Sequence, residues 1–181
     1  MHAEIRRIHR EIGTTFIFVS HDQSEALALS DRIAIFDQGC LQQIGKPQEI
    51  YERPANRFCA QFLGHLNVFP LRIPVHDNYQ VTGQFEDCQI SAPCTLDSLP
   101  SQVCIGIRPE YMTLSKTPLQ NKNSIPVLID GYSYQGASTK LTLKSRSGLK
   151  FEHDVSSSTA PLPSSEEDLW LNWPIEKGLV I

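Results

Sequence analysis

Two different hydrophobic patterns follow one another at the N-terminal end of the chain. Isoleucines recur at helical spacing among charged side chains, at Ile5, Ile8 and Ile12. This spacing predicts an amphipathic helix over residues 2–12, and Gly13 is placed to end it. Residues 14–19 (TTFIFV) are β-branched and aromatic without alternation. That second pattern predicts a strand covered on both faces, as in a parallel sheet.

Polar residues follow this strand at a junction typical of α/β folds. Ser20 and His21 precede Asp22, and Glu25 lies three residues further on. This is the pattern of a capping box, which predicts a helix from Asp22 through about Leu29. We therefore expect His21 at the C-terminal edge of a parallel sheet, where α/β proteins bind their ligands.

A hairpin and two short helices are predicted next. Apolar runs at 33–36 and 41–44 flank an Asp-Gln-Gly turn signal, which favours a tight hairpin. Proline and asparagine signals then predict short helices over 48–51 and 57–63.

The pattern changes after about His65, where short alternating runs are separated by proline, glycine, serine and asparagine. This texture predicts an all-β region, arranged as a small closed barrel of the OB type. A polar stretch at 156–168 is expected to be a loop. The candidate strands are residues 68–73, 79–82, 103–107, 127–134, 138–144, 149–153, 169–173 and 179–181.

Composition excludes several classes of protein. The chain has 181 residues, of which 40% are hydrophobic and 20% charged, so a folded globular protein is expected. Its net charge of −4 gives no basic field for nucleic acid, and no nucleic-acid partner is expected. No apolar run approaches the roughly 20 residues of a membrane span, and the charged start does not resemble a signal peptide. We therefore expect a cytoplasmic chain whose five scattered cysteines are reduced thiols.

Several stretches closely resemble one family, the ATPase subunits of ABC importers of the maltose and polyamine type. The resemblance is nearly continuous over residues 2–64 and looser in the later part of the chain. It is carried by FIFVSHDQSEAL at 16–27, SDRIAIFDQG at 30–39, GKPQEIYERPANRF at 45–58, FLG at 62–64, GIRPE at 106–110, YQG at 134–136 and WLNW at 170–173. The last three resemble the accessory β-barrel (TOBE) region of those subunits.

The resemblance implies a role for His21 as the switch histidine, which contacts the γ-phosphate of ATP and helps to orient the attacking water. A neutral imidazole suits this role because it can donate a hydrogen bond to a terminal phosphate oxygen. The family would use ATP and Mg²⁺ and would act with a second ATPase subunit as a homodimer. Its other partners would be membrane-spanning permease subunits and, indirectly, a periplasmic solute receptor. The assembled subunit would be peripheral at the inner face of the membrane.

The Walker A, glutamine-loop, signature and Walker B motifs of such ATPases are not found in this sequence. The nearest decoy, Gly39 to Pro47, has five residues between its glycines and ends in proline, so we reject it as a phosphate loop. The chain therefore resembles the C-terminal half of a longer subunit. Residues 1–64 would be the C-terminal end of an ATP-binding P-loop cassette, an α/β remnant, and residues 65–181 an all-β OB-like barrel. Such a chain is not expected to bind ATP tightly or to hydrolyse it without an N-terminal ATPase half.

Other interpretations stay open at this point. One is a noncatalytic regulatory or dimerisation module, and another is a nonfunctional gene fragment. Polyamine (spermidine or putrescine) is the first choice of solute, with iron, phosphonate and sugar as alternatives. His65, His76 and His153 are expected to be solvated surface histidines without ligand spacing, so no metal site is predicted. Trp170 and Trp173 are expected to pack in a core or an interface.

Overall fold

The computed structural model describes residues 2–96, 98–157 and 167–181, which fall into two compact units, Met1–His65 and Leu66–Ile181. The chain is mostly β-sheet with a few short helices. The polar loop predicted at 156–168 lies largely outside the described residues.

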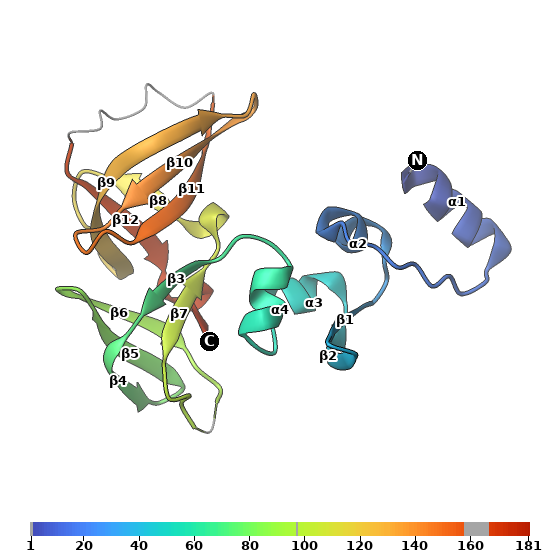
Figure 1. The fold of residues 1–181 in the computed structure, drawn as a ribbon, viewed down its shortest axis with the longest axis horizontal. Helices are drawn as coiled ribbons and strands as arrows, with labels where there is room; N and C mark the ends of the chain where they lie inside the picture. The colour runs from blue at the N-terminus through green and yellow to red at the C-terminus, as the bar shows by residue number, and fades with distance from the viewer. Residues whose placement is uncertain (1, 97, 158–166) are drawn as a thin grey trace. The chain divides into compact units, whose positions relative to one another are not determined.

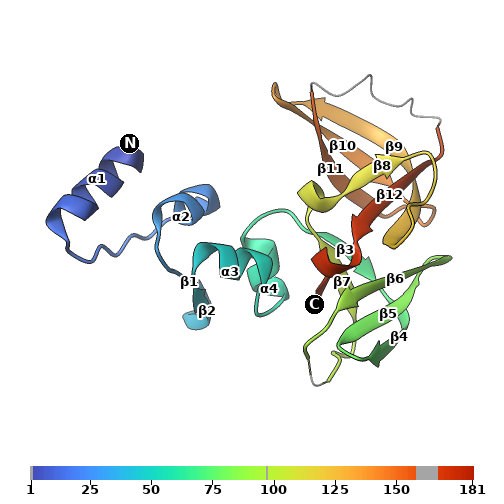
Figure 2. The same ribbon diagram turned by 180° about the vertical axis from the view of Figure 1, so that it is seen from behind.

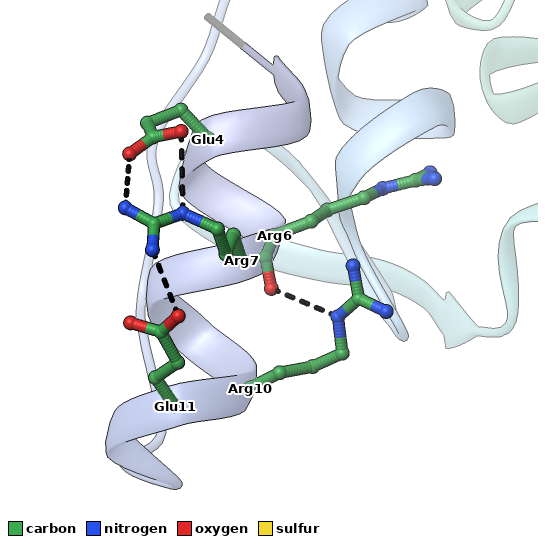
Figure 3. Close-up of polar contacts among 5 residues, drawn as sticks. All are labelled: Glu4, Arg6, Arg7, Arg10 and Glu11. Carbon is green, nitrogen blue, oxygen red and sulfur yellow. Dashed lines mark hydrogen bonds and ion pairs between the residues drawn. The ribbon is translucent and has the colours of Figure 1, made fainter.

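The N-terminal unit begins with the predicted helix, α1 (His2–Ile12). Arg7 lies between two acidic residues one turn away on either side, at 2.6 Å from Glu4 and 2.8 Å from Glu11 (Figure 3). Pairs at this spacing stabilise a helix by about 0.2–0.5 kcal/mol each. Arg10 adds a hydrogen bond from its Nε to the carbonyl of Arg6 at 3.3 Å. Gly13 ends the helix with a φ of 67°.

The strand predicted over residues 14–19 does not form. The segment is irregular, and its apolar side chains are exposed: Phe16 47%, Ile17 92%, Phe18 57% and Val19 84%. A strand requires a neighbour that takes up its backbone hydrogen bonds, and no strand of the described structure pairs with this segment. The prediction of a parallel sheet here is therefore not met by residues 2–65, whose only paired strands are antiparallel.

The rest of the N-terminal unit follows the sequence pattern closely. The hairpin and all three remaining helices were predicted, and they are α2 (Gln23–Leu29), β1 (Ile33–Asp37), β2 (Cys40–Gly45), α3 (Pro47–Glu52) and α4 (Arg57–Phe62). Asn56 caps α4 by accepting a hydrogen bond from the Cys59 amide at 2.9 Å. Ile35, Ile50 and Leu63 lie at the centre of the small core that these elements share.

The second unit is built almost entirely of strands. They are β3 (Asn67–Pro70), β4 (Arg72–Asp77), β5 (Gln80–Phe85), β6 (Cys88–Pro93), β7 (Cys104–Ile107), β8 (Thr113–Ser115), β9 (Lys122–Tyr134), β10 (Ser138–Lys144), β11 (Lys150–Ser156), β12 (Leu169–Pro174) and β13 (Leu179–Val180). Two single-turn 3₁₀ helices, Pro109–Tyr111 and Ile175–Lys177, interrupt them. All eight predicted strands are present, although the first is divided into β3 and β4, and β6 and β8 were not predicted.

The expectation of one closed barrel is wrong. The strands of this unit form three sheets, ordered β11-β10-β9-β12-β8, β13-β7-β3 and β4-β5-β6. In both views, the five-stranded sheet and the β4-β5-β6 sheet lie at opposite ends of the unit, with β3 and β7 between them (Figures 1 and 2). All three sheets contribute to one core, in which Phe69 stacks on Phe151 and on Trp173.

Buried asparagines link neighbouring sheets through side-chain hydrogen bonds. The Asn67 side chain of β3 takes up both backbone groups of Glu152 on β11, accepting from its amide at 2.8 Å and donating to its carbonyl at 2.7 Å. Asn123 of β9 does the same to Ser91 on β6, at 2.8 and 2.7 Å. A carboxamide reproduces the donor and acceptor of a peptide group. The side chains therefore satisfy edge groups that backbone pairing would use in a closed barrel.

Candidate functional site

His21, the residue singled out from the sequence, lies in the N-terminal unit on the loop that leads into α2. Its side chain is exposed, and together with Asp22, Gln23 and Ser24 it lines an open hollow of the surface. Within the part of the chain that the structure describes, no hydrogen bond from the imidazole is found.

Asp22 caps α2, as the sequence predicted. Its Oδ1 accepts hydrogen bonds from the amides of Ser24 at 2.8 Å and Glu25 at 3.2 Å, and from the Ser24 hydroxyl at 2.5 Å. These bonds satisfy amides that have no partner within the helix. The aspartate next to the histidine is thus accounted for by helix capping.

Ser20 adds contacts that reading of the sequence missed. Its Oγ accepts a hydrogen bond from the Asp22 amide at 2.9 Å, and its hydroxyl faces two acceptors, Glu25 Oε2 at 3.1 Å and the Asp22 carbonyl at 3.3 Å. In a simple capping box the glutamate reaches the cap amide directly. Here the serine hydroxyl lies between the two. The signal available in the sequence was a serine two residues before the capping aspartate, since serine hydroxyls bind backbone groups at this spacing.

The hydrogen bonds of Ser20 and Asp22 restrain the backbone on both sides of His21. The imidazole itself takes part in no hydrogen bond among the described residues. Such a ring can donate or accept a hydrogen bond at a ligand that is brought to it. Among the described residues, no group of three or more histidine, cysteine or acidic side chains is arranged to hold a metal ion.

The other predicted histidines lie in the second unit or at its border. His65 and His76 are exposed, which confirms the prediction for both. The prediction for His153 is wrong, because this side chain is only 7% exposed. It follows Phe151 by two positions on β11 and therefore points into the same core. Its Nδ1 lies 3.3 Å from the carbonyl oxygen of Pro109, and burial lowers the pKa of the imidazole.

Packing accounts for two motifs of the second unit. Trp173 is completely buried in the core, as predicted, and Trp170 is half-buried. In the GIRPE stretch, a side chain at Gly106 would meet Leu66 Cδ2 at 2.7 Å, so the Leu66 side chain would have to move to admit it. Arg108 of the same stretch is 2% exposed. These residues belong to the second unit, whereas His21 belongs to the first.

No helix of the described residues is both long enough and apolar enough to cross a membrane. The exposed helices are short, and α1 carries charged residues along most of its length.

Comparison with known proteins identifies relatives over the whole chain. Residues 105–181 match the model of the TOBE domain family. A spermidine/putrescine import ATP-binding protein PotA of Thermobifida fusca is 34% identical over 185 aligned residues, covering 100% of this chain and 48% of the relative. Those of Fusobacterium nucleatum and Aliivibrio fischeri are 35% and 36% identical, covering 98% and 83% of this chain.

The chain spans about half the length of the relatives that it matches. The chain spans 51% of the Fusobacterium protein and 41% of the Aliivibrio protein. Among solved structures, the cytoplasmic molybdate-binding protein ModG with molybdate bound is matched with a TM-score of 0.49 and 10% identity, over 64% of this chain and 94% of that chain. The chain is a homologue of the C-terminal part of the PotA import ATP-binding proteins of ABC transporters, and its residues 105–181 form a TOBE domain.

Proposed function

We propose that the chain acts as the C-terminal part of the ATP-binding subunit of an ABC importer for polyamines, in which ATP hydrolysis drives solute import. The observation that carries the proposal is the match of the entire chain to a spermidine/putrescine import ATP-binding protein at 34% identity. Spermidine and putrescine enter the proposal through the names of the relatives. The permease and receptor subunits would select the solute.

Each unit has a separate role in this proposal. Residues 1–64 supply the C-terminal end of the ATPase domain, and residues 65–181 supply the accessory TOBE region. The phosphate loop, the Mg²⁺ ligands and the catalytic carboxylate come from an upstream ATPase half. ATP and Mg²⁺ are therefore bound mainly outside this chain, and His21 reaches the terminal phosphate once the halves meet.

The exposed apolar side chains of residues 16–19 provide a physical reason for the two halves to associate. Four consecutive apolar side chains without a covering element are costly in water, at about 25 cal/mol per Å² of apolar surface left exposed. Paired as a strand with the upstream half, the segment would bury these side chains and place His21 at the end of a strand. The remaining partners in the proposal are a second ATPase subunit and the membrane-spanning permeases, with the assembly at the inner face of the membrane.

Mixing the two halves tests the proposal. The upstream ATPase segment of the Aliivibrio fischeri relative is purified separately and combined with this chain. We expect Mg²⁺-dependent ATP hydrolysis from the mixture and none from this chain alone. The control is the same mixture with the phosphate-loop lysine of the upstream segment replaced by alanine.

The alternative predicts a different result. If the halves do not associate and this chain forms a nucleotide-independent dimer, the proposal is contradicted and a noncatalytic dimerisation module is supported. ATP hydrolysis by this chain without the upstream segment would contradict both.

A further inference from the structure

The hydroxyl group of Ser20 restrains the loop that carries His21 on both sides of the histidine. We propose that Ser20 and Glu25 are positioning residues for His21, an inference that rests on the proposed function of that histidine. Ser20 precedes His21, and its Oγ accepts the amide hydrogen of Asp22, the residue that follows. The bond of 2.9 Å therefore spans His21 itself.

Glu25 fixes this turn to the helix. Its Oε2 accepts the hydroxyl hydrogen of Ser20 at 3.1 Å from the first turn of α2. A hydrogen bond to an ionised carboxylate is stronger than one between neutral groups. The Asp22 carbonyl at 3.3 Å is the more distant of the two acceptors. Ser20 and Glu25 are both half-buried, whereas His21 between them is exposed.

The position of the imidazole depends on the hydrogen bonds that Ser20 makes to Asp22 and Glu25, because no other hydrogen bond among the described residues holds the ring. In the described ranges no side-chain hydrogen bond restrains His21, so its location is set by the φ and ψ angles of the loop. Ser24 also bonds to the capping Asp22, through its hydroxyl at 2.5 Å, but it lies on the helix side and does not span the histidine. Ser20 therefore positions His21, whereas Ser24 contributes only to the cap of α2. Substitutions at the two serines test these two roles separately.

The first test uses the chain itself. In nuclear magnetic resonance measurements, Ser20→Ala should increase hydrogen exchange of the Asp22 amide and the mobility of the His21 side chain and backbone. Ser20→Thr, which retains the hydroxyl, should leave both close to the unmutated chain. Ser24→Ala is the matched control and should alter the Ser24 amide and the start of α2 without mobilising His21. Equal mobility of His21 in Ser20→Ala and in the unmutated chain would overturn the proposal.

The second test uses the complex with the upstream ATPase segment. We expect Ser20→Ala to lower kcat for ATP roughly tenfold with little change in KM, because misplacement of a reacting group affects the chemical step. The same substitution made together with His21→Ala should cause no further loss, since Ser20 acts only through the histidine.

The outcomes separate the two proposals. If His21→Ala lowers kcat but Ser20→Ala does not, or if the two effects multiply, the positioning role is wrong and the function of His21 stands. If His21→Ala has no effect on kcat, the proposed function of the histidine fails. The positioning role that rests on it then fails as well, even where the first test has shown that Ser20 orders the loop.

Discussion

The environment of His153 shows how strand alternation decides the chemistry of a single residue. Phe151 and His153 point to the same face of β11 and are both buried, whereas Asp154 points to the opposite face and is exposed. Burial lowers the pKa of His153, although its bond to the Pro109 carbonyl and the charge of Asp154 act in the opposite direction. Arg108, which is also buried, lies next to Pro109 in the chain. Burial therefore favours the neutral form of this histidine.

This burial predicts a loss of stability in mild acid. An imidazole whose pKa is lower in the folded state binds protons more readily when the chain is unfolded. Its contribution to stability is complete above the unfolded value of about 6.5 and falls as the pH drops from there toward the folded value. Urea unfolding at about pH 7.5 and about pH 5.5 measures the difference. We expect His153→Gln to weaken the dependence of the unfolding free energy on pH over this range.

His76 supplies the control for this prediction because it is exposed in the same unit. His76→Gln should leave the pH dependence unchanged. The account of His153 is refuted if His153→Gln and the unmutated chain lose the same unfolding free energy on acidification.

Between elements, two asparagines replace backbone pairing where one sheet meets another. Asn123 on β9 satisfies the amide and carbonyl of Ser91 on β6, and both residues are buried. Asn123→Ala should destabilise the second unit by about 2–6 kcal/mol, because two buried backbone groups lose their partners at about 1–3 kcal/mol each. The free energy of unfolding from denaturant titration measures this loss. Gln89→Ala, at an exposed position of β6, is the control and should have little effect.

A loss below about 0.5 kcal/mol for Asn123→Ala, within the range of ordinary surface substitutions, would mean that the asparagine does not join the sheets. Asn67→Ala provides a second measurement at the equivalent link between β3 and β11.

Elements with strong local signals were predictable from the sequence, and those that depend on distant partners were not. The helix at 2–12, the cap at Asp22 and the hairpin at 33–45 follow from spacing and turn residues alone. Residues 14–19 carry a strong strand pattern but need a neighbouring strand, which a local pattern does not report. β6 was missed because its Ser-Ala-Pro ending has the composition of a loop.

In the candidate site too, the local contact of the helix cap was predictable, and the contact that depends on the folded turn was not. The capping role of Asp22 was found from the sequence, because a cap is a contact between near neighbours. His21 was singled out through the family resemblance, and its role stays a prediction. The contact from Ser20 to Glu25 was missed because serine hydroxyls have several possible local acceptors, and only the folded turn decides among them. The links that Asn67 and Asn123 make between sheets were missed because their partners lie far along the chain.

At the scale of the whole molecule, the two units differ in how much apolar surface they bury. The first has a small core around Ile35 and Ile50 and exposes the apolar run at 16–19. The second has a larger core to which all three of its sheets contribute. Regions with few buried apolar contacts open at lower free energy. We therefore expect limited proteolysis to remove the first unit and leave a stable product that begins near Leu66.

Cleavage of the chain in denaturant is the control, because it shows that sites in the second unit are cut once unfolded. Mass spectrometry of the native digest identifies the product. Equal resistance of residues 2–65 and the second unit would show that the exposed run is covered in solution, and the expected difference in stability would be wrong.

The central claim is that His21 acts on the terminal phosphate of ATP when the upstream half is present. The direct measurement compares ATP turnover and ATP affinity in the assembled complex for His21→Ala, with His76→Ala as the control at another exposed histidine. The account predicts that His21→Ala abolishes most hydrolysis and leaves the Kd for ATP nearly unchanged, because the phosphate loop holds the nucleotide and the histidine acts in the transition state. Unchanged turnover in His21→Ala would contradict the claim, and a loss of ATP binding itself would assign the residue a structural role at the start of α2.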